Sequence, residues 1–339
     1  LVDRFLEDAT EVDVDAVRDR LGDVMIGAVM EHVEEAGVHS GDSACVIPPP
    51  HLSASVVARI EDHTLAIAEA LDVRGPINVQ FAVKDDEVYV IEANPRASRT
   101  VPFVAKATGV PLAKVASRVM MGATLAELRN EGLLCERVVG DHVAVKEAVL
   151  PFNRFPEADP VLGPEMRSTG EVMGIDLTTG LAFMKSQISA GGALPESGTV
   201  FLSLADRDKV VGLEAARGLQ DLGLDVVATS GTAEYLRANG VPVDTVVAKL
   251  GEEGTDAVEL VRSGAVQMVV NSPRGRGPRA DGEHIRAAAG AQGIPLMTTA
   301  NAALAAARGL ADWQRFPLAV RTLQEYHRGV RRSEQEIVQ

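Results

Sequence analysis

One stretch of sequence decides the fold: INVQFAV at residues 77–83, KDDE at residues 84–87 and VYVIEANP at residues 88–95. Apolar and polar residues alternate in the first segment, which is typical of a β-strand with one buried face. The charged segment KDDE predicts a turn, and the third segment continues as a second strand. Pro95 lacks a backbone N–H and ends that strand. The sequence therefore predicts a β-hairpin.

The register of this hairpin decides which polar side chains meet. With residues 85–87 as the loop, Gln80 lies opposite Glu92, and Asn94 shares their face. The apolar pairs in this register are Phe81 with Ile91 and Val83 with Tyr89. Side-chain oxygens from Gln, Glu and Asn suit Mg²⁺ and do not suit zinc. The alternative is an amphipathic hairpin whose polar face is only solvated.

Composition bounds the class of protein. The chain has 339 residues, of which 46% are hydrophobic and 24% charged, as in a soluble protein with a sizeable core. A formal net charge of −15 argues against a general nucleic-acid binder. No apolar run approaches the length of a membrane span, and no signal peptide is recognisable. Cys45 and Cys135 form no disulfide framework, and we expect reduced thiols in a cytoplasmic protein.

Two sequence blocks predict two domains. Residues 190–198 are small and Gly-rich, which is typical of a linker, so the expected domains are residues 1–189 and residues 199–339. Because the chain starts at Leu1 inside a strand-like run, we expect it to be a piece of a longer protein. The expected fold class is α/β: an α+β portion with an antiparallel sheet, followed by a Rossmann-like domain with a parallel sheet.

Strands and helices alternate along the second block. Because this rhythm predicts a parallel sheet with helices on both faces, ligands are expected at the carboxyl ends of the strands. The predicted strands are residues 200–204, 225–229, 245–247, 268–271 and 296–297. The predicted helices are residues 209–222, 232–240, 256–263, 283–291 and 300–309. In the first block, a helix is expected from a cap at Ser53 or Ser55 to Leu71, after a β-rich run at residues 24–33.

Five short motifs carry a resemblance to a known family. They are EEAGVHSGDSA at 34–44, NVQF at 78–81, IEANPRASRTVPF at 91–103, KATGVPLA at 106–113 and GPEMRSTGEVMG at 163–174. Their order and spacing resemble the second ATP-grasp domain of the carbamoyl phosphate synthetase large-subunit family. The resemblance covers nearly the whole first block. It implies ATP- and Mg²⁺-dependent phosphorylation of carbamate, for arginine and pyrimidine biosynthesis.

The resemblance also implies roles for individual residues of the first block. Gln80, Glu92 and Asn94 would bind Mg²⁺ or Mn²⁺ with the phosphates of ATP, and K⁺ is a possible further ion. Arg96 and Arg99 would stabilise the phosphoryl group or the carbamate. The residues expected to contact ATP itself are Glu11 at the ribose, Leu6 at the adenine, and Gly37, Val38, His39 and Ser40 along the nucleotide, with Gln80 and Glu92 at the phosphates.

Two regulatory sites are implied in the same way. The family binds the activator ornithine where Glu34, Asp42, Glu147 and Thr298 stand here; the alternative is that the three acids are ordinary surface residues. The second block resembles the family's methylglyoxal-synthase-like domain, which binds UMP as an inhibitor and IMP as an activator. The expected nucleotide-binding residues are Ser203, Lys209, Thr229, Thr232, Lys249 and Asn271.

The turn TSGT at residues 229–232 supports a phosphate site, since it offers hydroxyls and N–H groups where a helix begins, although most such turns are simple caps. The sequence departs from the family pattern after Asn271, where Ser272-Pro273 replaces a pair of threonines. The choice of effector is therefore open. Arg274, Arg276 and Arg279 either bind phosphate or form a solvated loop, and the loop is favoured.

Several alternatives remain open at the level of sequence. Another ATP-grasp ligase, such as a biotin carboxylase or a purine-pathway carboxylase, would lack the second block. A methylglyoxal synthase would need aspartates in the loop after Lys249, which reads LGEEG at residues 250–254. The chain could also be a non-catalytic regulatory or oligomerisation module.

The resemblance implies partners as well. They are the remainder of the large subunit, a glutaminase small subunit bound through the missing half, and further copies in an oligomer, without nucleic acid or membrane. We expect this chain alone to be inactive.

Overall fold

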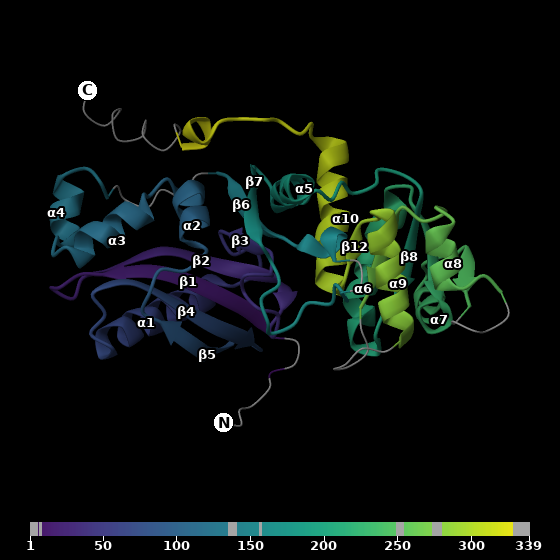
Figure 1. Ribbon diagram of the computed structural model, residues 1–339, viewed down its shortest axis with the longest axis horizontal. Helices are drawn as coiled ribbons and strands as arrows, with labels where there is room; N and C mark the ends of the chain where they lie inside the picture. Colours follow the sequence, from purple (N-terminus) through teal and green to yellow (C-terminus); the bar gives the residue numbers. More distant parts are fainter. Residues whose placement is uncertain are drawn as a thin grey trace. The chain divides into compact units, whose positions relative to one another are not determined.

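The computed structural model describes residues 6, 9–134, 141–155, 158–248, 254–272 and 280–327, which form two compact units (Figure 1). Unit 1 comprises Leu1–Lys146, Ile175–Thr179 and Ala319–Gln339; unit 2 comprises Glu147–Gly174 and Gly180–Leu318. The run at Leu1, Cys135, Lys249 and the arginines of residues 273–279 lie outside the described residues.

The division into units does not follow the sequence linearly. Residues 147–174 and 180–189 group with unit 2 rather than with the strands that precede them. The domain boundary at residues 190–198 stays a prediction; α5 (Thr179–Ala190) ends where this segment begins, and the next strand starts at Thr199.

The larger sheet has seven strands in the order β5-β4-β1-β2-β3-β6-β7. The pairs from β5 through to β6 are antiparallel, as predicted for the first block. Its strands are β1 (Thr10–Arg18), β2 (Val24–Glu35), β3 (Cys45–Ile47), β4 (Gly75–Lys84), β5 (Glu87–Asn94), β6 (Val143–Val149) and β7 (Gly170–Asp176).

The two faces of this sheet differ in polarity because side chains alternate along each strand. Val12 and Val14 of β1 share a buried apolar cluster with Val56 and Ile60 of α1 (Ala54–Ala70), a helix capped by Ser53 as predicted. The alternate residues of β1 are acidic, and they therefore occupy the opposite face. That face is partly covered by α2 (Val101–Thr108) and α3 (Leu112–Met120), with α4 (Leu125–Asn130) beyond them.

The hairpin is present, but its turn is shorter than predicted. Lys84 pairs with Glu87, so that the turn consists of Asp85 and Asp86 alone. Their φ angles are 52° and 62°, the positive values that a two-residue type I′ turn requires. The predicted three-residue loop is therefore wrong.

A β-bulge corrects the register further along the hairpin. Ile91 has no partner, because Phe81 pairs with Val90 and Gln80 pairs with Glu92. The extra residue offsets the shorter turn, so that the predicted pair of Gln80 and Glu92 is confirmed. The apolar pairs predicted nearer the turn are wrong. As the first strand in the sheet order, β5 is an edge strand, and its Val90 and Ile91 side chains are half exposed.

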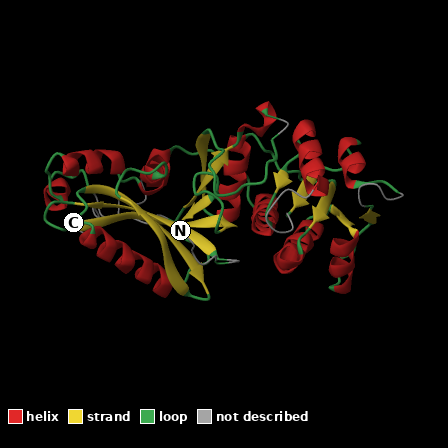
Figure 2. Ribbon diagram, turned by 60° about the horizontal axis from the view of Figure 1, so that its bottom comes forward, coloured by secondary structure: helices red, strands yellow, loops and turns green. Residues whose placement is uncertain are grey.

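The second sheet confirms the predicted parallel domain. Its five strands follow the order β10-β9-β8-β11-β12, and all neighbours are parallel. Helices lie on both sides (Figure 2): α8 and α9 pack against each other, as do α6 and α10. The strands are β8 (Thr199–Ser203), β9 (Asp225–Thr229), β10 (Thr245–Val247), β11 (Met268–Asn271) and β12 (Leu296–Met297). The helices are α6 (Lys209–Asp221), α7 (Ser230–Ala238), α8 (Ala257–Arg262), α9 (Ala280–Gln292) and α10 (Ala300–Arg315).

Candidate functional site

The hairpin gathers three oxygen donors at the end away from its turn. The Gln80 Nε2 donates to Ser40 Oγ at 2.8 Å, and the Asn94 Nδ2 donates to Glu92 Oε1 at 2.8 Å. Because both amide nitrogens serve neighbouring groups, the amide oxygens are the atoms offered to a cation. Glu92 adds a carboxylate that is exposed in the described chain. This donor set fits a hard divalent cation.

The predicted nucleotide strip borders these oxygens. Gly37 has a φ of 107°, which only glycine adopts easily, and its N–H donates to Glu11 Oε2 at 3.4 Å. The Gly41 N–H donates to His39 Nδ1 at 3.0 Å. Ser40 lies at the end of the strip, against Gln80. The strip and the oxygen donors are thus joined through Ser40, and the role of Leu6 at the adenine stays a prediction.

Acidic side chains surround the cluster. Burial raises the pKa of Glu11 above its usual value, and the nearby charges of Asp13 and Glu92 act in the same direction. Glu11 and Glu92 thus repel each other, and a cation between them would offset this repulsion.

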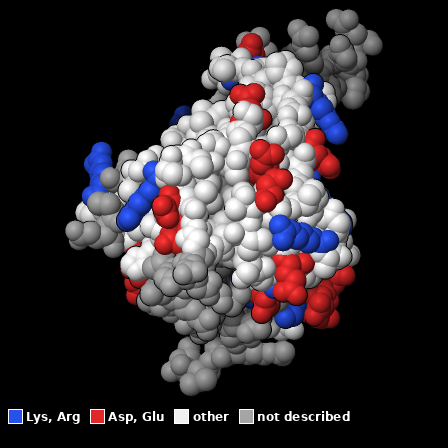
Figure 3. Space-filling model, turned by 90° about the vertical axis from the view of Figure 1, so that its right-hand side faces the viewer, with Lys and Arg blue, Asp and Glu red and all other residues white. Residues whose placement is uncertain are grey.

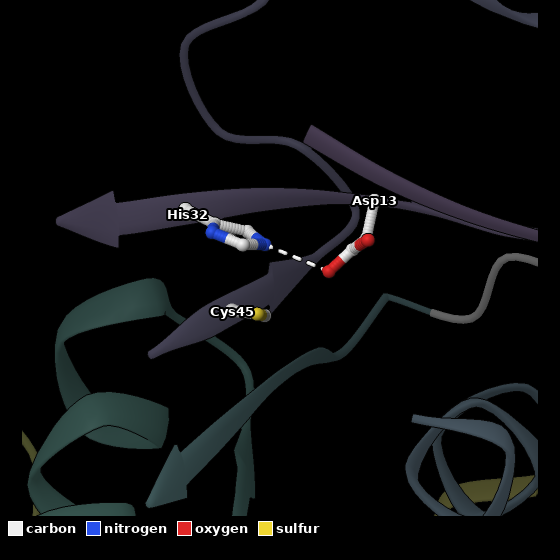
Figure 4. A group of neighbouring side chains, drawn as sticks. All are labelled: Asp13, His32 and Cys45. Atoms are coloured by element: carbon white, nitrogen blue, oxygen red, sulfur yellow. Dashed lines mark hydrogen bonds and ion pairs between the residues drawn. The ribbon is translucent and has the colours of Figure 1, made fainter. Parts of the chain in front are cut away.

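A second group of donors lies deeper on the same face. Figure 4 shows Asp13, His32 and Cys45 converging from β1, β2 and β3. Their ligand atoms lie within 4.8 Å of one another, as a metal site would need, but the group already has a different role. His32 Nε2 donates to Asp13 Oδ2 at 3.0 Å. Although burial opposes it, neighbouring Cys45 and this hydrogen bond raise the pKa of His32 well above its usual 6.5.

His32 thus faces Asp13 in ion-pair geometry through Nε2, while its Nδ1 lies 3.9 Å from Glu11 Oε1. Lys146 of β6, which is fully buried, adds a second positive charge to this face and donates from Nζ to Ser40 O at 3.0 Å. Although burial opposes it, the hydrogen bond and charge of His32, together with the charge of Lys146, lower the pKa of Asp13; burial raises the pKa of Glu34 in spite of Lys146. Acidic and basic side chains thus stand side by side on this face of the sheet.

The loop with the predicted arginines is anchored on Asp15. This buried carboxylate accepts hydrogen bonds from Thr100 Oγ1 at 2.6 Å and from Ser98 Oγ at 2.7 Å. Burial outweighs these bonds and raises the pKa of Asp15 to about 6. Arg96 and Arg99, on either side of Ser98, are exposed. Arg96 also borders a cavity of about 160 Å³ that Asp15 and α3 line.

The four residues predicted to bind ornithine do not all lie in one unit. Glu34 and Asp42 are buried in unit 1, and the Ala44 N–H donates to Glu34 Oε2 at 2.7 Å. Glu147 and Thr298 belong to unit 2, where Glu147 Oε2 accepts from Gln187 Nε2 at 2.6 Å. Two of the three acids are thus buried, not ordinary surface residues, and their joint role stays a prediction.

The predicted effector residues of unit 2 gather at one edge of the parallel sheet. Ser203, Thr229 and Asn271 are the last residues of β8, β9 and β11, and Ser203 pairs with Asn271. Lys209 begins α6, and Thr298 follows β12 directly. This edge is where parallel sheets bind ligands.

Thr232 is placed differently, because it is almost fully buried. Its Oγ1 accepts hydrogen bonds from the Leu204 N–H at 3.0 Å and from Thr229 Oγ1 at 3.2 Å. The buried Thr232 hydroxyl therefore connects the segments that follow β8 and end β9. Lys209 Nζ pairs with Asp206 at 2.8 Å and lies 5.6 Å from the ring centre of Tyr235.

Sequence reasoning missed four polar residues: Asp15, Lys146, Asp159 and Arg286. Asp15 stands in the alternating run EVDVDAV at residues 11–17, which could have indicated a polar sheet face. Lys146, Asp159 and Arg286 gave no comparable signal, because their partners are distant in the sequence.

One face of the molecule carries charges of both signs. On the face in Figure 3, Lys and Arg side chains lie scattered among Asp and Glu side chains. Within the described part of the chain, no helix combines the length and apolarity needed to cross a bilayer.

Comparison with known sequences places the chain among its relatives. Residues 1–128 match the family described as carbamoyl-phosphate synthase L chain, ATP binding domain, and residues 212–298 match the MGS-like domain. The carbamoyl phosphate synthase large chain of Mycobacterium tuberculosis is 55% identical over 97% of this chain and 31% of its own length. That of Gemmatimonas aurantiaca is 52% identical over 96% and 29%.

Among solved structures, the biotin carboxylase domain of a single-chain bacterial carboxylase matches with a TM-score of 0.37 and 23% identity, over 44% of this chain and 34% of that one. The sequence relatives extend across both units, and the chain spans about a third of their length. The chain therefore belongs to the carbamoyl phosphate synthase large-chain family, and it carries the family's ATP-binding and MGS-like regions.

Proposed function

We propose that unit 1 supplies part of the site at which a carbamoyl phosphate synthase phosphorylates carbamate with ATP. The observation that carries this proposal is the register of the hairpin, which brings Gln80 and Glu92 together beside the strip that ends at Ser40. Family membership supports it independently. The whole protein would use glutamine-derived ammonia and serve arginine and pyrimidine biosynthesis.

In this proposal, Gln80, Glu92 and Asn94 would hold Mg²⁺ or Mn²⁺. A bound ion would supply positive charge to offset the charge of the ATP phosphate oxygens. Arg96 and Arg99 would bind the anionic oxygens of the phosphoryl group or carbamate, as exposed guanidinium groups on a loop fixed by Asp15 can. Catalysis here depends on position and charge, with no covalent nucleophile.

The metal site can be tested with two glutamates of one strand. We expect Glu92→Gln to weaken Mn²⁺ binding, measured by electron paramagnetic resonance, at least tenfold, because it removes the charged donor. Glu87→Gln is the matched control, since Glu87 lies on the same strand at the turn, about 16 Å away at the usual rise per residue. In the whole protein, only Glu92→Gln should abolish carbamoyl phosphate formation. Equal behaviour of the two variants would refute the assigned site.

We also propose that this chain alone does not synthesise carbamoyl phosphate, because it spans about a third of its relatives' length. An assay with ATP, bicarbonate and ammonia should give no turnover above background. Measurable synthesis by this chain would contradict the proposal.

For unit 2 we propose a nucleotide-effector site at the edge formed by Ser203, Thr229 and Asn271. The gathering of these strand ends supports it, together with the MGS-like match. Calorimetric titration with UMP and with IMP should give saturable one-to-one binding to at least one. Absence of binding to both would favour a structural or oligomerisation module. Ornithine control through Glu34, Asp42, Glu147 and Thr298 is proposed from the family alone.

A further inference from the structure

Unit 2 buries a charged side chain that the proposed function does not use. Arg286 of α9 is only 2% exposed and is the largest of the fully buried side chains. A buried guanidinium needs a partner for its charge and its donors. Arg286 finds both: its Nε and Nη2 donate to the two carboxylate oxygens of Asp159 at 2.7 and 2.5 Å, and its Nη1 donates to Asn271 Oδ1 at 2.6 Å.

The last of these bonds fixes the orientation of Asn271. A guanidinium group has only donors, so the atom of Asn271 that faces it must be the amide oxygen. The amide nitrogen is then left as the group that Asn271 can offer at the carboxyl edge of β11. A donor at this position suits an anion such as a phosphate. A carboxylate partner in place of Arg286 would favour the opposite orientation.

Asp159 is itself held in place by the segment between β6 and β7. Its Oδ1 also accepts from the Val161 N–H at 3.1 Å, and its backbone oxygen accepts from Arg167 Nη1 at 2.6 Å. Although burial opposes it, the hydrogen bond from Arg286 lowers the pKa of Asp159 below its usual 3.8, so that the pair is ionised at neutral pH. Arg286 is therefore already neutralised and is not a free phosphate-binding charge.

The missing side chain at Gly282 leaves room for the guanidinium group of Arg286. A Cβ on Gly282, one helical turn before Arg286, would lie 2.7 Å from Arg286 Nη1 and 3.3 Å from Asn271 Oδ1. Because the guanidinium is held by two partners, it cannot move aside freely. The Gly282→Ala substitution thus disturbs this contact without removing a charge.

We propose that Arg286 is a positioning residue for the effector pocket: it turns the amide nitrogen of Asn271 toward the ligand, and Asp159 ties this orientation to residues 158–169. The inference rests on the proposed effector site. A ligand that contacts Asn271 would therefore also affect the position of the segment that leads into β7, because Arg286 connects Asn271 to Asp159.

The test uses Asp159→Asn and Gly282→Ala, with Arg308→Gln as control. Arg308 forms an exposed ion pair with Glu214 of the same unit, at 2.9 Å. We expect the first two variants to bind UMP or IMP at least tenfold more weakly in calorimetry, and the control to bind within twofold of the unsubstituted chain. Asparagine-selective nitrogen-15 labelling should show the Asn271 side-chain amide signal shifted in both test variants before ligand is added. The other native asparagine signals should be unchanged, apart from the new signal that Asp159→Asn introduces.

Two results separate this inference from the proposed function. If the unsubstituted chain binds a nucleotide and both test variants bind it equally well with an unshifted Asn271 signal, the positioning role is refuted. If the unsubstituted chain binds neither nucleotide but the Asn271 signal moves in the variants, Arg286 orients Asn271 as described, and the nucleotide site that this orientation was proposed to serve is refuted. Loss of all folded signals in one variant leaves the other to decide.

Discussion

The two units place their polar residues in different parts of a sheet. In unit 1 they stand on alternate positions in the middle of antiparallel strands, so their meeting depends on register, and the acids of β1 among them are buried. In unit 2 they stand at the ends of parallel strands, so topology alone brings them together. A site on a sheet face therefore depends on the pairing register of its strands, whereas a site at strand ends depends on the order of the strands in the sheet.

The largest loss of stability should come from removing the positive charge that balances the buried acids on the polar sheet face of unit 1. Lys146→Met leaves buried carboxylates without their counter-charge, and we expect the free energy of unfolding to fall by about 3–5 kcal/mol. Lys209→Met is the matched change in unit 2. The Lys209 partner, Asp206, is 81% exposed, so we expect a loss of about 0–1 kcal/mol. Urea unfolding followed by circular dichroism measures both, and equal losses would remove the distinction between the units.

A smaller effect should follow from the pH dependence of the same face. Asp15 has a pKa of about 6 when folded and an ordinary value of 3.8, so the folded state binds its proton more tightly. The stability that this proton contributes is complete below pH 3.8 and is lost as pH rises through 6. Its size is at most about 3 kcal/mol. Asp15→Asn should abolish this component, seen as a flatter profile of unfolding free energy between pH 4 and 7. Parallel profiles for both proteins would argue against the raised pKa.

The smallest effect concerns the turn that sets the register. Asp85 and Asp86 both have positive φ angles, which Asn and Gly tolerate better than Asp. The double change Asp85→Asn with Asp86→Gly should therefore raise the free energy of unfolding by about 0.5–1 kcal/mol, measured by urea titration. A loss of stability would instead favour the three-residue loop that the sequence predicted.

The sequence predicted unit 2 better than unit 1. The strands β9 to β12 were predicted with their observed bounds, because each is a short apolar run between turn residues. α10 runs to Arg315, six residues beyond the prediction, since Gly309 does not end it. The hairpin was found by its alternation, but the bulge at Ile91 was not, because an extra residue leaves no pattern in one strand alone.

The missed site residues share a physical reason. Arg286 stands in a stretch, EHIRAAAG, that is typical of an exposed helix, and its partner Asp159 is 127 residues away. The acids of β1 are similarly ambiguous, since a solvated strand and a strand paired with buried cations have the same alternation. Only the fold decides between these two possibilities, because the balancing charges come from β2 and β6.

The edge position of β5 has a practical consequence for handling the chain. Within the described part of the chain, β5 has no strand on its outer side, and in its run VYVI at residues 88–91 Val90 is 51% and Ile91 49% exposed. Such an edge is a template on which a second chain can add a strand, and the amount of this intermolecular pairing increases with protein concentration. Concentrated solutions of this chain should therefore aggregate through edge-to-edge pairing of β5, which is measured as turbidity. The Val90→Lys substitution should suppress this aggregation.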